Sequence, residues 1–332
     1  MSTGPSATSS TNPGASLNLP LTPTPRRTVR TRICIISDTH NALPPLPPSD
    51  ILIHCGDISY TGRVSEFAPT IAHLASHPAP LKLVIAGNHD ITLDKAYYAK
   101  RRGYMHGDVI EDVNTVEEMW KGEEARAKGI RYLEEGVTEW DVGNGAGLRG
   151  EDRYNADSTT GSGVSGAAEN PVPDFGDSHK GGGGGRGTGV DIMITHGPPR
   201  GILDATFDKV PVGCKNLRRA VERAKPLVHC FGHIHEGWGI GRMRHSNGSF
   251  AREVARKDTS WWNKDREEKG YVYVDLTKGA EKEVKWGEQT MFVNAAIMDV
   301  RYRPVQKPWL LDVDLPVRDE EKTDEDEYGV IS

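Results

Sequence analysis

The stretch LKLVIAGNHD (residues 81–90) decides the fold, because an apolar run stops there in a glycine followed by three polar residues. An apolar run of this length that is bounded by turn residues is typical of a buried strand. The sequence therefore predicts that Asn88, His89 and Asp90 lie just beyond the carboxyl end of a strand. In open α/β sheets, active sites form at this end.

Four further apolar runs end in the same way, each with Asp or His at its last positions. They are ICIISDTH (33–40) with Asp38 and His40, ILIHCGD (51–57) with Asp57, DIMITHGPP (191–199) with His196, and LVHCFGHIH (227–235) with His233 and His235. Carboxylate, amide and imidazole groups gathered at one sheet edge suit divalent transition metals. We therefore expect a two-metal site at this edge.

Length and composition limit the class of protein. The chain has 332 residues, and motifs spread from residue 38 to residue 235 favour one domain. A mean hydropathy of -0.55 indicates a globular core that carries long polar segments. A net charge of -6 gives no basic surface for stable nucleic-acid binding, and no apolar run is long enough to span a membrane.

The cysteines favour a reducing compartment. Three of the four lie inside apolar runs, and their spacing shows no pairing: Cys34, Cys55, Cys214 and Cys230. We expect free thiols and an intracellular, cytoplasmic protein. The arginine- and serine-rich start leaves organellar targeting open.

Composition also divides the chain into segments. We expect a disordered tail over residues 1–30, one domain over 31–316 and an acidic tail over 317–332. Within the domain, the glycine-rich stretch 141–189 and the charged stretch 242–287 are predicted insertions. Apolar spacing predicts helices over 61–77 and 214–224 and a strand over 131–140. The runs TMFVNAAIMDV and PWLLDVDL are expected to complete a second sheet.

In chain order the strand ends read D-x-H, GD, GNHD, THG and GHIH, and together they resemble the signature of the calcineurin-like metallophosphoesterase superfamily. Alone, each residue would more often be a turn former or a satisfied loop histidine, but five such motifs in order are hard to obtain by chance. The longer forms THGPPRGILD and FGHIHEGWG are similar to the metallophosphoesterase-domain-containing branch, which is associated with hydrolysis of cyclic nucleotides and other phosphodiesters. The resemblance implies a four-layer α/β fold, a β-sandwich flanked by helices.

The resemblance also implies roles for the motif residues. One metal would be held by Asp38, His40 and His235, and a second by Asn88, His196 and His233, with Asp57 bridging the two. Two metals lower the pKa of a shared water and offset phosphoryl charge during in-line attack. Mixed nitrogen and oxygen ligands favour manganese, with iron or zinc as alternatives.

The remaining motif residues are expected to act on the leaving group. His89 resembles the family's non-ligand histidine, which donates a proton to the leaving oxygen, and Asp90 is expected to orient its ring. The predicted function is hydrolysis of a small phosphodiester, with cyclic nucleotides as candidates. A phosphomonoesterase or protein phosphatase and a catalytically weak metal-binding scaffold are the alternatives.

Five other residues near the motifs have an open role. His54 and His229 lie inside the apolar runs and are read as hydrogen-bonded strand histidines. Asn41 and Arg200 follow motif residues and are candidates for phosphate contacts, with ordinary loop solvation as the alternative. Trp238 is a candidate for stacking on a base, although packing in the core is the simpler interpretation.

Overall fold

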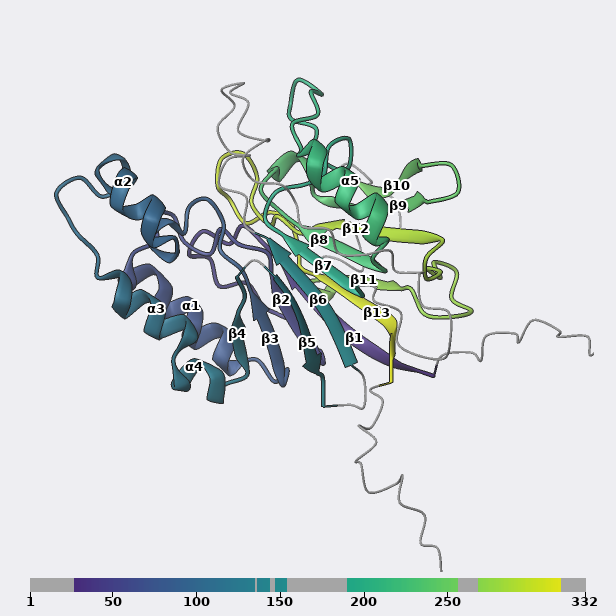
Figure 1. The fold of residues 1–332 in the computed structure, drawn as a ribbon, viewed down its shortest axis with the longest axis horizontal. Coiled ribbons are helices and arrows are strands. Elements are labelled where there is room, and N and C mark those ends of the chain that lie inside the picture. The colour runs from purple at the N-terminus through teal and green to yellow at the C-terminus, as the bar shows by residue number, and fades with distance from the viewer. Residues whose placement is uncertain (1–26, 135, 144–146, 154–189, 256–267, 318–332) are drawn as a thin grey trace, which may run out of the picture.

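The computed structural model describes residues 27–134, 136–143, 147–153, 190–255 and 268–317. Two sheets make up the centre of the molecule (Figure 1). The first has the order β11-β13-β1-β2-β3-β4, with β11 (Val272–Asp275), β13 (Trp309–Pro316), β1 (Thr28–Ile36), β2 (Ile51–His54), β3 (Leu81–Val84) and β4 (Ile130–Tyr132). The second has the order β10-β9-β12-β8-β7-β6-β5, with β10 (Ser249–Ala255), β9 (Gly239–Arg244), β12 (Gln289–Asn294), β8 (Val228–Phe231), β7 (Ile192–Thr195), β6 (Gly147–Arg153) and β5 (Gly136–Asp141).

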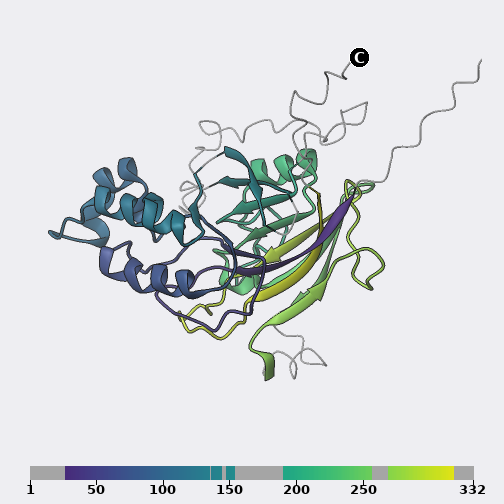
Figure 2. The ribbon, with the colours of Figure 1, turned by 90° about the horizontal axis from the view of Figure 1, so that it is seen from below.

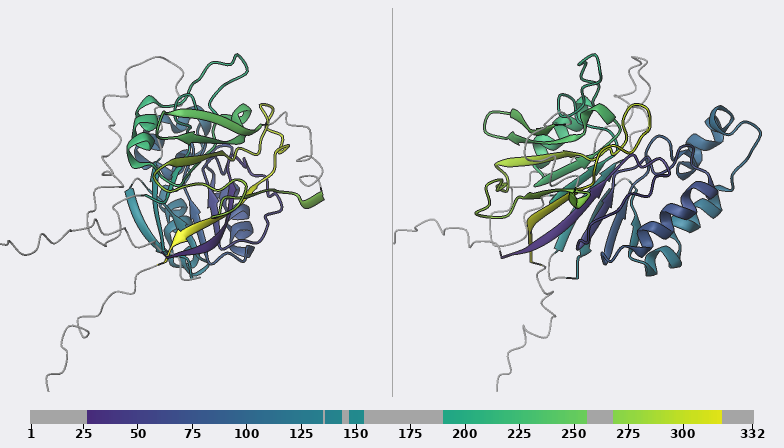
Figure 3. Two further views of the ribbon diagram at one scale, coloured as in Figure 1. Left: turned by 90° about the vertical axis from the view of Figure 1, so that its right-hand side faces the viewer. Right: turned by 180° about the vertical axis from the view of Figure 1, so that it is seen from behind.

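Helices cover the outer faces of both sheets (Figures 1 and 3). The first sheet carries α1 (Val64–Ser76), α3 (Val113–Lys121) and α4 (Glu123–Ala127), and α2 (Lys95–Met105) lies beside them after the short helix η1 (Ile91–Leu93). The second sheet carries α5 (Lys215–Ala224). The expected four-layer α/β sandwich is therefore confirmed.

Three apolar clusters hold the four layers together. The largest lies between the sheets and includes Ile33 and Ile53 of the first and Ile194 and Met291 of the second. A second cluster packs the first sheet against α1 and α3, and a third packs the second sheet against α5. The central strands β2, β3, β7 and β8 are buried along their whole length, which explains why their sequences are continuously apolar.

Both expected helices form close to their predicted bounds. The helix expected over 61–77 is α1, and Glu66 at its third position accepts the backbone N–H of Arg63, as in a capping box. The helix expected over 214–224 is α5, which buries Leu217, Ala220, Val221 and Ala224 along one face. This spacing is that of an amphipathic helix that covers a sheet.

Two strand predictions were wrong. Residues 131–140 form parts of two strands, β4 and β5, which belong to different sheets. Strand β13 lies in the first sheet, antiparallel to β1, so the two ends of the described chain run side by side (Figure 2). Arg30 and Arg32 of β1 both donate to the Asp312 carboxylate of β13. A strand run gives no information about which sheet it will join.

The predicted boundaries of the tail and of both insertions also need correction. Strand β1 begins at Thr28, inside the expected tail, and β6 lies inside the first insertion. Strands β10 and β11 lie inside the second insertion. Strand β10 pairs only with β9 at the edge of its sheet, and edge strands tolerate charged residues. Residues 1–26, 144–146, 154–189, 256–267 and 318–332 of the expected tails and insertions lie outside the described residues.

Two tryptophans connect the sheets. Trp309 of β13 stacks on Trp238 with ring centroids 4.7 Å apart and an interplanar angle of 23°. Both side chains are buried, and each indole N–H donates to a backbone carbonyl at 3.2 Å, of Lys307 for Trp238 and of Asn294 for Trp309. Trp238 is therefore a core residue, and the suggestion that it stacks on a base is wrong.

We predict that Trp309→Ala lowers the free energy of unfolding by about 3–5 kcal/mol, because it removes a fully buried aromatic side chain and leaves a cavity. Urea denaturation of the full chain measures this loss. Phe207→Ala is the control, since Phe207 is 73% exposed, and a change below about 0.5 kcal/mol is expected there. Equal losses in the two variants would contradict the stacking argument.

Candidate metal centre

The motif residues meet because the strands that precede them are parallel. Strands β1, β2 and β3 are parallel in the first sheet, and β7 and β8 are parallel in the second. Backbone hydrogen bonds join the two sheets at this edge, from Ser37 N to Ala295 O at 3.0 Å and from Ile297 N to Ser37 O at 3.1 Å. The carboxyl ends of all five strands therefore face one place.

The metal-ligating residues predicted from the sequence lie in two clusters, and His40 and Asp57 also form a third group with His89. The first cluster consists of Asp38, His40 and His235, and the second of Asp57, His196 and His233. Within each cluster, one ligand atom from every residue lies within 4.8 Å of the others. Asn88 joins the second cluster, because its Oδ1 lies 2.9 Å from His196 Nε2.

Asp57 lies between the two clusters. Its Oδ2 is 3.7 Å from Nε2 of His40 and 3.3 Å from Nε2 of His196, and Asp38 Oδ1 is 3.2 Å from Nε2 of His235. Two atoms that bind one ion at about 2.1 Å lie about 3.0–3.4 Å apart in octahedral or tetrahedral geometry. The donor atoms therefore already have nearly the spacing that shared cations require.

Backbone carbonyls orient the histidine rings. The Nδ1 atoms of His40, His196 and His235 bond to the carbonyls of Ser59, Cys55 and Asp299 at 3.1, 2.9 and 3.0 Å. Such a bond fixes the tautomer and turns Nε2 toward the site. The Nε2 of His40 is buried and has no hydrogen-bond partner among the residues that the structure describes. A buried, unpaired imidazole nitrogen fits a metal ligand, so the residues present suit divalent cations.

The electrostatics of the clusters leave two of the histidines neutral and one protonated. Burial lowers the pKa of His40 and of His233 to about 4, so both rings are neutral near pH 7. Burial opposes the charged form of His196 too, but the Asp57 carboxylate outweighs it and raises that pKa to about 9. A cation that binds His196 must therefore displace a proton, which makes metal affinity increase with pH.

Two glycines let the carboxylates approach the backbone. A Cβ atom on Gly87 would lie 2.2 Å from Asp57 Oδ1, and one on Gly232 would lie 1.9 Å from Asp38 Oδ2. The carboxylate oxygens occupy the space that a side chain would fill. There, Asp57 Oδ1 accepts the backbone N–H of His89, and Asp38 accepts the backbone N–H of His233. These contacts explain the glycine in GNHD and in GHIH.

Several site residues have a strained backbone. Non-glycine residues with positive φ include Asp38 (53°), His40 (42°), Asp57 (52°) and His233 (66°). Each such conformation costs about 1–3 kcal/mol and persists only where surrounding contacts enforce it. Four of the seven predicted ligands have this strain, which marks the cluster as a functional site.

His89 and Asp90 lie at the site, but their predicted partnership is wrong. Nδ1 of His89 bonds to the Tyr60 carbonyl at 2.7 Å, and the ring contacts that of His40 edge to face at 4.7 Å. The Asp90 carboxylate instead accepts backbone N–H groups of Ile58, Ser59 and Gly87 and the Ser59 hydroxyl. Asp90 therefore ties the loop after β2 to the loop after β3, and the Tyr60 carbonyl orients His89.

The two strand histidines have equivalent places in the two sheets. His54 of β2 bonds to Thr39 Oγ1 at 3.0 Å, and His229 of β8 bonds to Thr195 Oγ1 at 2.9 Å. Each threonine precedes a histidine of the clusters. Burial lowers the pKa of both strand histidines to about 3, so they are neutral. Their interpretation as hydrogen-bonded strand residues is confirmed.

Sequence reasoning missed residues that surround the clusters. Tyr60 and Tyr302 have ring contacts with His40, and Asp299 orients His235. Asn41, which was predicted from the sequence as a candidate for phosphate contacts, donates its amide to Glu66 at 2.9 Å. Tyr60 lies three residues after Asp57, which is a usable signal, whereas nothing in the sequence near Tyr302 indicates its place.

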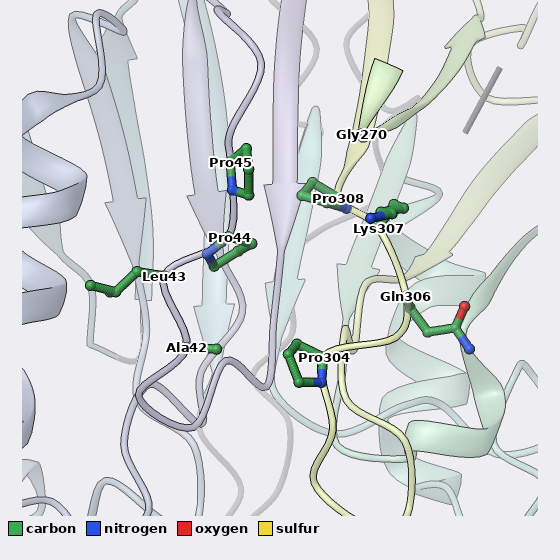
Figure 4. Close-up of a pocket in the computed structure, with 9 residues that line it drawn as sticks. All are labelled: Ala42, Leu43, Pro44, Pro45, Gly270, Pro304, Gln306, Lys307 and Pro308. Atoms are coloured by element: carbon green, nitrogen blue, oxygen red, sulfur yellow. The ribbon is translucent and has the colours of Figure 1, made fainter. Parts of the chain in front are cut away.

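A small apolar pocket lies beside the loops that carry these residues (Figure 4). Its volume is about 230 Å³. One wall comes from the loop after His40 and includes Leu43 and Pro44, and the other comes from the chain after Tyr302 and includes Pro304 and Pro308. The structure thus places an apolar hollow beside a strongly polar centre.

The described helices include none that is both long and apolar enough to cross a bilayer. All four cysteines are free thiols, as expected.

Comparison with known proteins agrees with this architecture. Residues 31–237 match the family model described as calcineurin-like phosphoesterase. Metallophosphoesterase domain-containing protein 1 of Homo sapiens is 29% identical over 86% of this chain and 72% of its own length. The UPF0046 protein K07C11.7 of Caenorhabditis elegans is 30% identical over 63% of this chain and 65% of its own length.

A relative from Emericella nidulans, named probable rhamnogalacturonate lyase C, is 33% identical over 70% of this chain. The chain spans only 20% of the length of that relative, so its name carries no activity over to this chain. The family model covers more than half of the chain and contains every strand end that supplies a cluster residue. The chain therefore belongs to the calcineurin-like phosphoesterase family.

Proposed function

We propose that this chain is a dinuclear, metal-dependent phosphoesterase that hydrolyses a phosphodiester bond of a small substrate, with cyclic nucleotides as candidates. The observation that carries the proposal is the position of Asp57, whose Oδ2 faces a histidine of each cluster. A carboxylate in this position can join two cations, and two adjacent cations can activate a water and stabilise the attacking and leaving oxygens in phosphoester hydrolysis. Membership of the family supports the same reaction class.

We assign the ligands as the sequence predicted. Asp38, His40 and His235 would hold one cation, Asn88, His196 and His233 the other, and Asp57 would contact both. When bound, two divalent cations supply an activated water and neutralise phosphoryl charge. The mixed nitrogen and oxygen donors favour manganese, with iron or zinc as alternatives.

His89 is assigned to the leaving group. Its Nδ1 is occupied by the Tyr60 carbonyl, so Nε2 is the atom that would hold the proton for the departing oxygen. The ring is only partly buried, which leaves it accessible to a substrate. The carboxylate of Asp90 supports this arrangement indirectly, because it holds the loops that carry Tyr60 and His89.

A phosphomonoesterase is the main alternative, because the same clusters serve both reactions. Hydrolysis by the metal-stripped chain resupplied with manganese tests the choice, with bis-p-nitrophenyl phosphate, p-nitrophenyl phosphate and cyclic AMP compared. We expect metal-dependent turnover with the diester faster than the monoester. Faster turnover of the monoester would establish the phosphatase alternative. Bound metal without turnover of any substrate would instead support a metal-binding scaffold.

We predict that Asp57→Asn abolishes turnover and loosens both cations, since the amide removes the negative charge that the two sites share. Metal content after equilibrium dialysis is the measurement. Asp208→Asn makes the same change at an exposed position and is expected to retain both metals. Full metal content in Asp57→Asn would contradict the bridging assignment.

We predict that His89→Ala keeps both metals and slows hydrolysis by about 10²- to 10⁴-fold. The loss is expected to be larger for cyclic AMP, whose alkoxide leaving group needs a proton, than for a p-nitrophenyl ester, whose leaving group does not. Ratios of kcat for the two substrates measure this difference, with His73→Ala on α1 as the control. Metal loss in His89→Ala equal to that in Asp57→Asn would show that His89 is a ligand.

A further inference from the structure

Two tyrosines form a continuous aromatic surface at the edge of the metal centre. The Tyr60 ring stacks on His40 with centroids 5.3 Å apart, and the Tyr302 ring meets His40 edge to face at 4.8 Å. The tyrosine rings lie 5.8 Å from each other, and Tyr302 also contacts His89 and His235. The His40 side chain is fully buried, whereas Tyr60 and Tyr302 remain 39% and 41% exposed.

The carboxylate of Glu66 holds the backbone of Tyr60 in place. Glu66 of α1 accepts the backbone N–H groups of Tyr60, Thr61 and Arg63, and it also accepts the side-chain amide of Asn41. The carboxylate therefore binds the loop after Asp57 to the loop after His40. These bonds fix the Tyr60 backbone, and the ring is placed by its stacking on His40.

Asp299 does the same for Tyr302. Its carboxylate accepts the backbone N–H groups of Arg301 and Arg303 and the Arg303 guanidinium, and its carbonyl accepts the Tyr302 N–H at 2.9 Å. Tyr302 has a φ of 56°, a conformation that glycine or asparagine adopts at lower cost. An aromatic residue kept in a strained conformation beside a reactive centre points to a use for its ring.

We propose that Tyr60 and Tyr302 form a binding subsite for a planar aromatic group carried by the phosphoester, either an aryl ring or a nucleobase. This inference rests on the proposed phosphoesterase function and adds the substrate class. Stacked rings lie about 3.5–4 Å apart, so tyrosines with centroids at 5.8 Å admit no third ring between them. The substrate ring lies instead on their shared exposed surface, while its phosphate reaches the clusters.

The chemistry of this surface suits an amphipathic ring. Tyr60 and Tyr302 are both partly exposed, and within the described residues neither phenol hydroxyl has a hydrogen-bond partner. Both hydroxyls are free to bond to polar atoms at the edge of a substrate ring. Stacking of a ring on an aromatic side chain strengthens binding by roughly 5- to 100-fold.

The test compares the affinities of phenyl phosphate and methyl phosphate for the manganese-loaded full chain by titration calorimetry. The two ligands have the same phosphate group, so their affinity ratio isolates the ring. We expect phenyl phosphate to bind at least 5-fold tighter to the wild type. Tyr302→Leu and Tyr60→Leu are each expected to lower this ratio toward one, with metal content and methyl phosphate affinity retained.

Three controls sharpen the result. Tyr302→Phe retains the aromatic ring, so the ratio of phenyl phosphate to methyl phosphate affinity is expected to be unchanged. Tyr104→Leu removes a tyrosine that is 91% exposed on α2, and Leu43→Ser alters the apolar pocket; both are also expected to keep the ratio. An affinity ratio of phenyl to methyl phosphate that falls to one only in Leu43→Ser would place the aromatic subsite in the pocket and overturn the assignment.

The two proposals fail in different ways. Tight binding of methyl phosphate with a ratio near one in the wild type would overturn the aromatic subsite and leave the phosphoesterase standing. A ratio retained in both leucine variants would do the same. If the wild type bound neither phosphate, the proposed function and the subsite would both be overturned.

Discussion

The structure depends on the burial of two carboxylates, Asp38 and Asp57, among histidines from both sheets. A buried charge is tolerated only when it is paired and hydrogen-bonded. Here the backbone N–H groups of His233 and His89 supply part of the pairing, and His235 and His196 supply the rest. These partners come from the second sheet, except for His89, so the sheets can separate only by exposing or unpairing the charges.

The two sheets place their buried carboxylates and cluster histidines with the same kinds of contact. Each provides a glycine at which the backbone approaches a carboxylate, Gly87 in one and Gly232 in the other. Each also provides a buried strand histidine that bonds to the threonine beside a cluster histidine. The same contacts recur because parallel strands end at the same edge of a sheet, so the polar groups that follow them lie close together whatever their order along the chain.

The resemblance to the family implied the sandwich, and the apolar runs that stop in Asp, Asn or His indicated which residues converge. Sheet membership could not be predicted. The run that forms β13 has the same local pattern whether it pairs with β1 or with β12, and only tertiary packing decides. Tyr302 was missed because its position follows from a positive φ and from a carboxylate three residues earlier. Metal ligation by the converging residues stays a prediction.

Asp299 acts on the centre through two different groups. Its carbonyl bonds to His235, and its carboxylate holds the turn that carries Tyr302. The backbone at residue 302 is thus set without help from the Tyr302 side chain. A different side chain can therefore occupy that position on an unchanged turn. Under the proposed function, substitution of Tyr302 would change which esters bind without moving the clusters, whereas substitution of Asp299 would alter both the turn and the orientation of His235.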